Sequence, residues 1–122
     1  MPIRIDALSV DASDPGALAR WWSEALGWPL TVDDGDEVAL EPPEDERDGA
    51  VLPEILFVKA PDAKVIKNRL HLDLRPDDQA AEVARLEALG ARRVDIGQGE
   101  QTWIVLSDPE GNEFCVLSSR AT

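Results

Sequence analysis

The sequence predicts an α+β fold of two βαβββ modules in tandem, which together form a curved mixed sheet with a concave cleft. Two observations predict this fold. Segments with strand or helix character follow one another in the order β-α-β-β-β, and this order occurs twice along the 122 residues. The pair Leu26-Gly27, where the first helix is expected to end, recurs 63 positions later as Leu89-Gly90. A repeat of this length indicates a duplicated supersecondary unit.

The first module, residues 3–60, is expected to open with a strand and a helix. The imperfect alternation of residues 3–10 indicates a strand with a bulge or kink near Asp6-Ala7. Asp14 followed by Pro15 is a strong helix start, and Gly27 suits the left-handed position that ends a helix. Between them an apolar face recurs at helical spacing, so at least one of its two tryptophans is core: Leu18, Trp21, Trp22, Ala25 and Leu26.

Three strands and one loop are expected in the rest of this module. Residues 28–33 and 37–40 are predicted to be short strands joined by a turn at Asp34-Gly35. Residues 41–53 are rich in proline and acidic residues and have no periodicity, which is typical of a surface loop. Residues 54–59 are predicted to be a buried strand.

The second module, residues 68–119, begins with a strand predicted over residues 68–75. Leu70, Leu72 and Leu74 are expected to face the core. The other face of the strand then carries four polar side chains: Arg69, His71, Asp73 and Arg75. These four are therefore expected to line the polar, concave side of the sheet.

The remainder of the second module is expected to be a helix and three strands. Pro76-Asp77-Asp78 opens the helix, Gly90 ends it, and its buried stripe is Val83, Leu86 and Leu89. Strands are predicted over residues 93–96, 102–106 and 113–117. Asp108-Pro109-Glu110-Gly111-Asn112 suits a type I turn followed by a left-handed residue.

Composition limits the kind of protein. With 43% hydrophobic and 30% charged residues, the chain is typical of one soluble globular domain, residues 1–122. No apolar run approaches the ~20 residues that span a bilayer, and the N-terminal residues do not resemble a signal peptide. The single cysteine allows no intrachain disulfide. A cytoplasmic location is therefore expected.

Charge argues against two classes of partner. The net charge of −13 disfavours binding to nucleic acid or to an anionic membrane surface. Residues 33–54 contain ten acidic residues and one basic residue, Arg47, and so carry −9 of that charge. This stretch has two interpretations: a solvated surface, or a groove that attracts a cationic ligand.

Several of these segments resemble the vicinal oxygen chelate superfamily, which includes glyoxalase I, extradiol dioxygenases, fosfomycin-resistance enzymes and bleomycin-binding proteins. The segments are Asp14-Pro15, Leu26-Gly27-Trp28, residues 68–74 and residues 108–114, and the resemblance covers residues 3–119. Together they are similar to an actinobacterial-type glyoxalase-like subgroup. The resemblance implies a homodimer, but not a particular reaction, because the superfamily hosts several chemistries.

The resemblance also implies where metal ligands would lie. In the superfamily's enzymes they occupy the first and last strand of each module. The matching positions here are Ala7, Leu56 or Phe57, His71, and Cys115, which stands where the family has Glu. A divalent site needs three or four protein ligands, so we expect no cofactor. A divalent metal held by His71, Glu113 and Cys115 remains the alternative.

The expected ligand-binding residues are His71, Asp73, Arg69, Arg75, Trp103, Glu113 and Cys115; no catalytic residue is assigned. His71 is either a structural histidine or a group that contacts the ligand, since a histidine beside a carboxylate can act as acid or base. Trp103 could stack on a flat ligand. Cys115 is expected to be an inert thiol rather than a nucleophile.

Three functions remain open. The first is a metal-free protein that binds a cationic small molecule. The second is a metal-dependent lyase, isomerase or dioxygenase acting on a small oxygenated metabolite. The third is a structural or regulatory dimer without a small ligand. The chain shows no Ser-His-Asp, P-loop or Gly-rich dinucleotide pattern.

Overall fold

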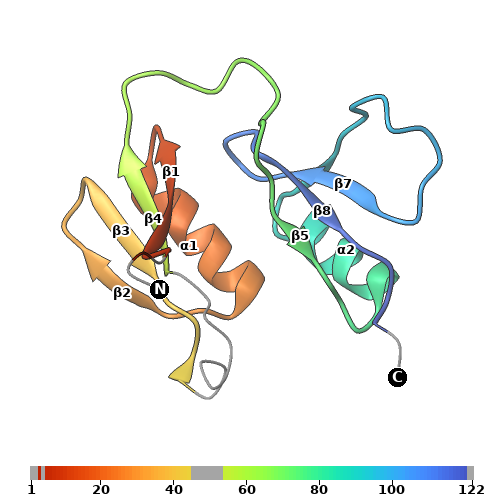
Figure 1. Ribbon diagram of the computed structural model, residues 1–122, viewed down its shortest axis with the longest axis horizontal. Helices are drawn as coiled ribbons and strands as arrows, with labels where there is room; N and C mark the ends of the chain where they lie inside the picture. Colours follow the sequence, from red (N-terminus) through yellow and green to blue (C-terminus); the bar gives the residue numbers. More distant parts are fainter. Residues whose placement is uncertain (1–2, 4, 45–53, 121–122) are drawn as a thin grey trace. The chain divides into compact units, whose positions relative to one another are not determined.

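The computed structural model describes residues 3, 5–44 and 54–120. The chain divides into two compact units, Met1–Ala63 and Lys64–Thr122 (Figure 1). In its described residues, each unit has one helix and one four-stranded mixed sheet, in the order β-α-β-β-β. This arrangement confirms the predicted class, α+β with two βαβββ modules in tandem.

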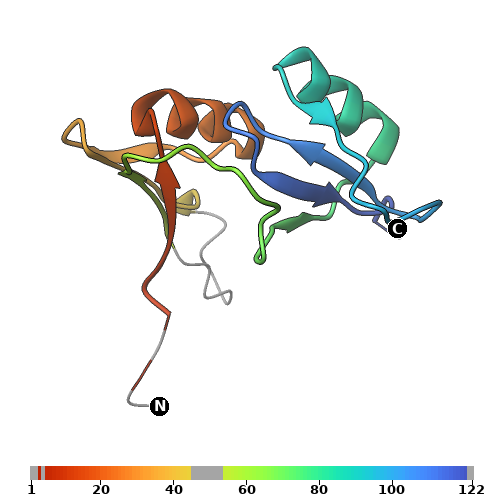
Figure 2. The same cartoon turned by 90° about the horizontal axis from the view of Figure 1, so that it is seen from above.

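In the first unit the strand order is β1-β4-β3-β2, with β1 parallel to β4 and the other pairs antiparallel. Its elements are β1 (Ala7–Ala12), α1 (Pro15–Leu26), β2 (Leu30–Asp33), β3 (Glu37–Leu40) and β4 (Glu54–Lys59). The helix α1 packs on one face of this sheet, and among the described residues no helix covers the other face (Figure 2).

Local capping sets the ends of α1, as the sequence predicts. The Asp14 carboxylate accepts a hydrogen bond from the backbone N–H of Ala17 at 3.1 Å, and Pro15 begins the helix. Gly27 follows the helix with φ of 72° and donates its N–H to the Ser23 carbonyl at 2.8 Å. A left-handed residue at this position is the usual helix stop.

The core of the first unit lies between α1 and one face of the sheet. Phe57 and Ile55 of β4 lie in register with Val38 and Leu40 of β3, and all four side chains are buried. Trp21 and Trp22 are both buried and pack edge to face, with ring centroids 5.1 Å apart. Such pairs add to the stabilisation that comes from their buried area. The prediction that at least one tryptophan belongs to the core is therefore confirmed.

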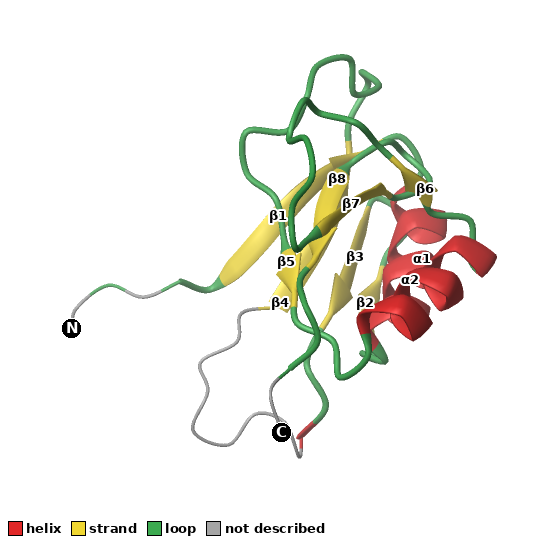
Figure 3. Ribbon diagram, turned by 90° about the vertical axis from the view of Figure 1, so that its right-hand side faces the viewer, coloured by secondary structure: helices red, strands yellow, loops and turns green. Residues whose placement is uncertain are grey.

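The second unit repeats this plan with shorter strands, in the order β5-β8-β7-β6. Its elements are β5 (Asp73–Leu74), α2 (Gln79–Ala88), β6 (Arg92–Arg93), β7 (Ile104–Ser107) and β8 (Glu113–Val116). In Figure 3 the helix of each unit lies on one side of its own sheet. The core beneath α2 is formed by Val83, Leu86, Leu106, Phe114 and Val116.

The turn between β7 and β8 is built on a buried carboxylate. Asp108 is only 4% exposed, and its carboxylate accepts hydrogen bonds from the backbone N–H groups of Glu110 and Asn112 and from the Asn112 side-chain amide. The Gly111 N–H donates to the Asp108 carbonyl at 2.9 Å, and Gly111 has φ of 87°. A turn at these residues with a left-handed Gly111 at its end agrees with the sequence prediction.

Several predicted strands are shorter than expected. The strand expected over residues 68–75 is reduced to Asp73–Leu74, and the prediction that Leu70 faces the core is wrong, since it is 81% exposed. The strand expected over residues 93–96 is reduced to Arg92–Arg93. Strand assignment requires a hydrogen-bonded neighbour, and sequence alternation does not report where pairing stops.

The outer limits of the first unit also differ from the prediction. β1 begins at Ala7, whereas Ile3 and Ile5 are exposed, and β2 begins at Leu30 rather than at residue 28. Of the loop expected over residues 41–53, residues 45–53 lie outside the described part of the chain. Within the described residues, no helix has the length and hydropathy needed to cross a membrane.

Candidate functional site

The helix-free face of the second sheet brings together residues from two strands. Asp73 of β5 is in parallel register with Cys115 of β8, whereas Leu74 is in register with Val116, whose side chain lies in the core. Residues directly opposite each other in a ladder share a face, and neighbours along a strand alternate. Asp73 and Cys115 therefore both point to the face opposite α2.

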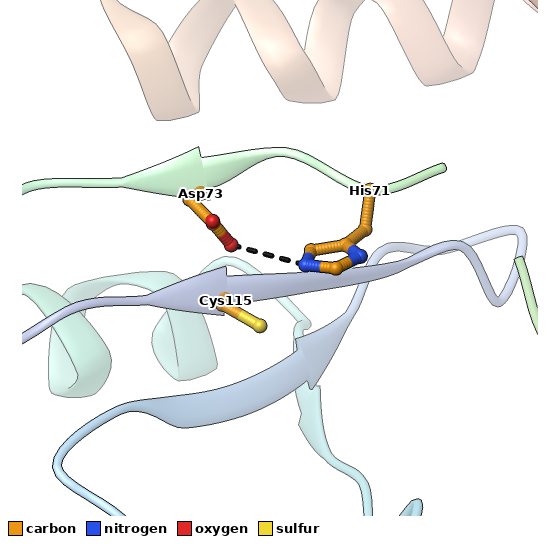
Figure 4. Close-up of side chains that lie close together, drawn as sticks. All are labelled: His71, Asp73 and Cys115. Carbon is orange, nitrogen blue, oxygen red and sulfur yellow. Dashed lines mark ion pairs between the residues drawn. The ribbon is translucent and has the colours of Figure 1, made fainter. Parts of the chain in front are cut away.

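His71 joins this pair from the segment that leads into β5. Its Nε2 lies 3.1 Å from Oδ1 of Asp73, and the two side chains are 40% and 53% exposed (Figure 4). The carbonyl of Leu72 accepts a hydrogen bond from the N–H of Cys115 at 2.9 Å, so the backbone between His71 and Asp73 is already paired with β8. The alternation along this segment places His71 and Asp73 on the same face.

The Cys115 thiol is the buried member of the group. Its residue is 6% exposed. Burial raises the pKa of Cys115, the charge and hydrogen bond of the Asp73 carboxylate raise it further, and the charge of Lys67 opposes them only in part. The thiolate is the nucleophilic form of cysteine. The environment thus favours an inert thiol over a reactive one.

Three kinds of ligand atom meet in this group. One ligand atom from each of His71, Asp73 and Cys115 lies within 4.8 Å of the other two. Imidazole nitrogen, carboxylate oxygen and cysteine sulfur are the donor types that bind transition-metal ions. The structure therefore gathers His71 and Cys115, as expected, but with Asp73 rather than Glu113 as the third member.

Glu113 is engaged elsewhere. Its carboxylate accepts hydrogen bonds from Nζ of Lys64 and from the backbone N–H of Asn68, both at 2.7 Å. Burial by itself would raise the pKa of Glu113, but the Lys64 and Asn68 hydrogen bonds and the Lys64 charge outweigh it, so that pKa lies below its ordinary value. This ionised carboxylate ties the segment that precedes β5 to β8.

Sequence reasoning did not identify Lys64 and Asn68 as partners of Glu113. Lys64 lies in the connector expected over residues 60–67, and Asn68 is the first residue of the strand predicted over residues 68–75. The separation of 49 positions between Lys64 and Glu113 is long-range. The excess of basic residues between Lys59 and Arg69 was visible in the sequence. It gave no indication of which carboxylate would meet them, because pairing at such a separation depends on the fold.

The remaining predicted site residues lie outside the cluster. Arg75 donates from Nη1 to the carbonyl and the hydroxyl of Ser118, each at 2.9 Å, so its guanidinium holds the end of the chain beyond β8. Arg69 is exposed. Trp103 is half-buried immediately before β7, two residues from Val105, which is in register with Cys115.

The helix-free face of the first sheet is acidic. Asp11 of β1 and Glu37 of β3 are both in register with Val58 of the intervening strand β4, and Glu54 lies on the same face of β4. Among the strand residues of this face there is no lysine or arginine. Three carboxylates on one face create a negative potential that attracts cations.

The two ligand positions that the family resemblance assigns to the first unit also lie in this sheet. Ala7 begins β1, and Leu56 is in register with Ser9 and Ala39 on the helix-free face. Phe57, the alternative position, is 1% exposed in the core beneath α1. The side chains of alanine, leucine and phenylalanine contain no atom that can coordinate a metal ion.

A family model and several solved structures resemble this chain. A family model described as a glyoxalase-like domain matches residues 7–117. No curated protein sequence matches the chain.

Among solved structures, the chain resembles TnmS3, an antibiotic-binding protein from Streptomyces sp. CB03234, with 25% identity and a TM-score of 0.66 over 98% of this chain and 99% of that one. A bleomycin resistance determinant encoded on the transposon Tn5 is 16% identical, with a TM-score of 0.62 over 98% and 100% of the two chains. A mutant of the fosfomycin resistance protein FosX from Listeria monocytogenes, complexed with Mn(II) and a dihydroxypropylphosphonic acid, is 14% identical, with a TM-score of 0.68 over 96% and 90%.

Proposed function

This chain belongs to the glyoxalase-like domain family, and from that premise we propose that it binds a small cationic molecule without transforming it. The observation that carries the proposal is the acidic, helix-free face of the first sheet, where Asp11, Glu37 and Glu54 gather without a basic strand residue. A cation approaching this face gains from all three carboxylates, and no charged group of the strands repels it.

The residues at the family's metal-ligand positions favour binding over metal-dependent catalysis. Ala7 and Leu56 supply no donor atom, so the first unit contributes nothing to a metal site of the kind that the resemblance implies. His71 and Cys115 alone are too few for that four-position set. A binding protein needs no such set, and TnmS3 is described as an antibiotic-binding protein.

A thermal-shift titration tests the proposal. We expect cationic glycopeptide antibiotics or other amines to raise the melting temperature, because a ligand held only by the native state stabilises it. Neutral and anionic compounds of similar size should have no effect. Salt should weaken the stabilisation, since surface charges are screened over about 8 Å at physiological ionic strength.

Two sets of variants locate the binding. The double variant Asp11→Asn, Glu37→Gln should lose most of the stabilisation by the cation. Glu100→Gln, which removes one exposed carboxylate from a loop of the second unit, should keep it. If no cationic compound stabilises the protein, or if the double variant responds like the parent, the proposal is wrong.

A second candidate function is a metal-dependent lyase, isomerase or dioxygenase acting on a small oxygenated metabolite. The contact of 3.1 Å between His71 and Asp73 favours it, because such a pair can move a proton. Elemental analysis of protein purified without a His tag, combined with an assay for turnover, distinguishes the candidates. Near-stoichiometric nickel, zinc, iron or manganese together with turnover of a metabolite would favour the enzyme.

We further propose that the protein is a cytoplasmic homodimer, as the single cysteine and the family resemblance suggest. Light scattering on the purified protein measures the mass in solution. A mass of one chain at micromolar concentration would contradict the dimer.

A further inference from the structure

The His71–Asp73–Cys115 cluster carries an inference that does not depend on the proposed function. We infer that these three residues form a site for a thiophilic divalent cation, of which Zn²⁺ is the best match, within the second unit alone. This site differs from the one that the family resemblance implies, because Asp73 is a ligand and the first unit supplies none. It is compatible with a binding protein, since it shares only two positions with the family's set.

The distances are close to those that a metal ion requires. In a tetrahedral zinc site with bonds of about 2.0–2.3 Å, neighbouring ligand atoms lie roughly 3.6 Å apart. Nε2 of His71 and Oδ1 of Asp73 are 3.1 Å apart, and all three ligand atoms lie within 4.8 Å of one another. The three ligand atoms therefore need to shift by about 1 Å to reach the spacing of a tetrahedral site, and rotation of the side chains can supply this shift.

The backbone fixes two of the three ligands against each other. Asp73 and Cys115 are register partners, and the hydrogen bonds from Cys115 N to Leu72 O and from Leu117 N to Leu74 O, at 2.9 and 2.8 Å, lie on either side of them. Ligands on paired strands lose little freedom when an ion binds. The ordering cost then falls mainly on the His71 ring, which is 40% exposed.

The donor set selects the ion. A thiolate ligand favours zinc-like ions, whereas magnesium, calcium and manganese prefer all-oxygen sites. The metal-free protein favours the thiol form of Cys115, but an ion that coordinates the sulfur deprotonates it. With Asp73 and Cys115 then both anionic, the two ligand charges balance those of a divalent ion, so the complex with neutral His71 carries no net charge. An uncharged assembly is tolerated beside the buried Val105, the register partner of Cys115 on β7, where a lone charge would be costly.

The exposure of the ligands leaves room for a fourth group. Cys115 is 6% exposed, while the side chains of His71 and Asp73 are 40% and 53% exposed, so the ion would be reached from the solvent side. Three protein ligands with one open position are typical of zinc sites that bind water or an exogenous ligand, whereas purely structural sites use four protein ligands. The fourth position is thus available to a donor atom of a small molecule.

Cobalt substitution tests the site with an optical signal. Protein purified without a His tag and treated with a chelator is titrated with Co²⁺, and Zn²⁺ is then added in competition. We expect one equivalent of Co²⁺ to produce visible bands of a four-coordinate ion together with a sulfur-to-cobalt charge-transfer band, and Zn²⁺ to remove both. Mn²⁺ and Mg²⁺ should compete at least 100-fold less well.

Variants separate the three ligands. Cys115→Ser should abolish the charge-transfer band, and His71→Ala and Asp73→Asn should each weaken Co²⁺ binding at least tenfold while their melting temperatures stay near that of the parent. Asp77→Asn, a change at an exposed aspartate of the same unit, should bind like the parent. If Cys115→Ser fails to fold, the charge-transfer band of the parent and its weakening in His71→Ala still decide the matter.

Two results would overturn the inference. One is the absence of a charge-transfer band in the parent at saturating Co²⁺, which would show that Cys115 is not a ligand. The other is a band whose Co²⁺ dependence is unchanged by both His71→Ala and Asp73→Asn, which would place the ion elsewhere. Neither result bears on the acidic, helix-free face of the first sheet, because Asp11 and Glu37 are intact in all of these proteins.

Discussion

Asp73 and Cys115 are direct partners across the parallel pair β5–β8, yet the Asp73 side chain is 53% exposed and Cys115 is 6% exposed. The cluster that they form with His71 thus extends from solvent into the sheet. Its three members should therefore contribute unequally to stability, the exposed ones least.

The first prediction concerns His71. His71→Ala should lower the free energy of unfolding by about 1 kcal/mol or less, because the ring is 40% exposed and its contact with Asp73 is open to water. Urea unfolding followed by circular dichroism measures the change. Phe114→Ala, in the core of the same unit, is the contrast and should cost about 3–5 kcal/mol. A loss at His71 as large as the one at Phe114 would place the ring in the core.

Gly27 provides a test of backbone conformation. Gly27→Val should destabilise the protein by about 1–3 kcal/mol, because φ of 72° strains a β-branched residue. A Cβ at this position would have no heavy atom within 4 Å beyond its neighbours in the chain, so crowding makes no contribution. Gly27→Asn should cost less, since asparagine tolerates the left-handed region better. Equal melting temperatures for Gly27→Val and the parent would contradict the cap.

The Glu113–Lys64 ion pair predicts a pH dependence. The pKa of Glu113 is lower in the folded chain than in the unfolded chain, so its contribution to stability is present above the ordinary carboxyl pKa, about 4.3, and is lost as pH falls through the lower folded value. Glu113→Gln should cost about 1–3 kcal/mol at pH 7 and much less at pH 2.

Urea midpoints for parent and Glu113→Gln across this pH range check the prediction. Lys64→Met combined with Glu113→Gln completes a double-mutant cycle that isolates the pair. A difference between parent and variant that is the same at pH 7 and at pH 2 would show that the carboxylate charge plays no part.

Asp108 should be among the most sensitive polar positions. Asp108→Ala leaves the N–H groups of Glu110 and Asn112 without their carboxylate acceptor in a buried turn, at a cost of about 2–3 kcal/mol. Asp77→Ala removes an aspartate whose side chain is 83% exposed and should leave the unfolding midpoint unchanged. Chemical denaturation of both variants makes the comparison. Similar midpoints for the two would mean that the turn does not depend on its carboxylate.

How much the sequence predicted depended on how local the determining interactions are. The start of α1 at Asp14-Pro15 and its stop at Gly27 were predicted correctly, because these residues act on backbone groups within a few positions. The shortness of β5 was not predicted, because the limits of this strand depend on where β8, some 40 residues away, offers hydrogen-bonding partners.

The candidate site shows the same division. Alternation along residues 69–75 is a local property, and the structure does place His71 and Asp73 together. Glu113 shares the face of Cys115 by alternation, which made it a plausible neighbour of His71. Its carboxylate instead binds Lys64 and Asn68, and the approach of that segment to β8 is a property of the fold that no local pattern encodes.

The matched caps of the two helices bear on how the chain folds. Asp14 accepts from the N–H of Ala17, and Asp78 accepts from the N–H of Ala81, both at 3.1 Å, so each unit carries its own signal for a first helical turn. Forming that turn is the unfavourable step in making a helix, and a cap lowers its cost before distant strands have met. Each half of the duplication therefore has its own nucleus, and the two halves can acquire structure in parallel rather than in sequence.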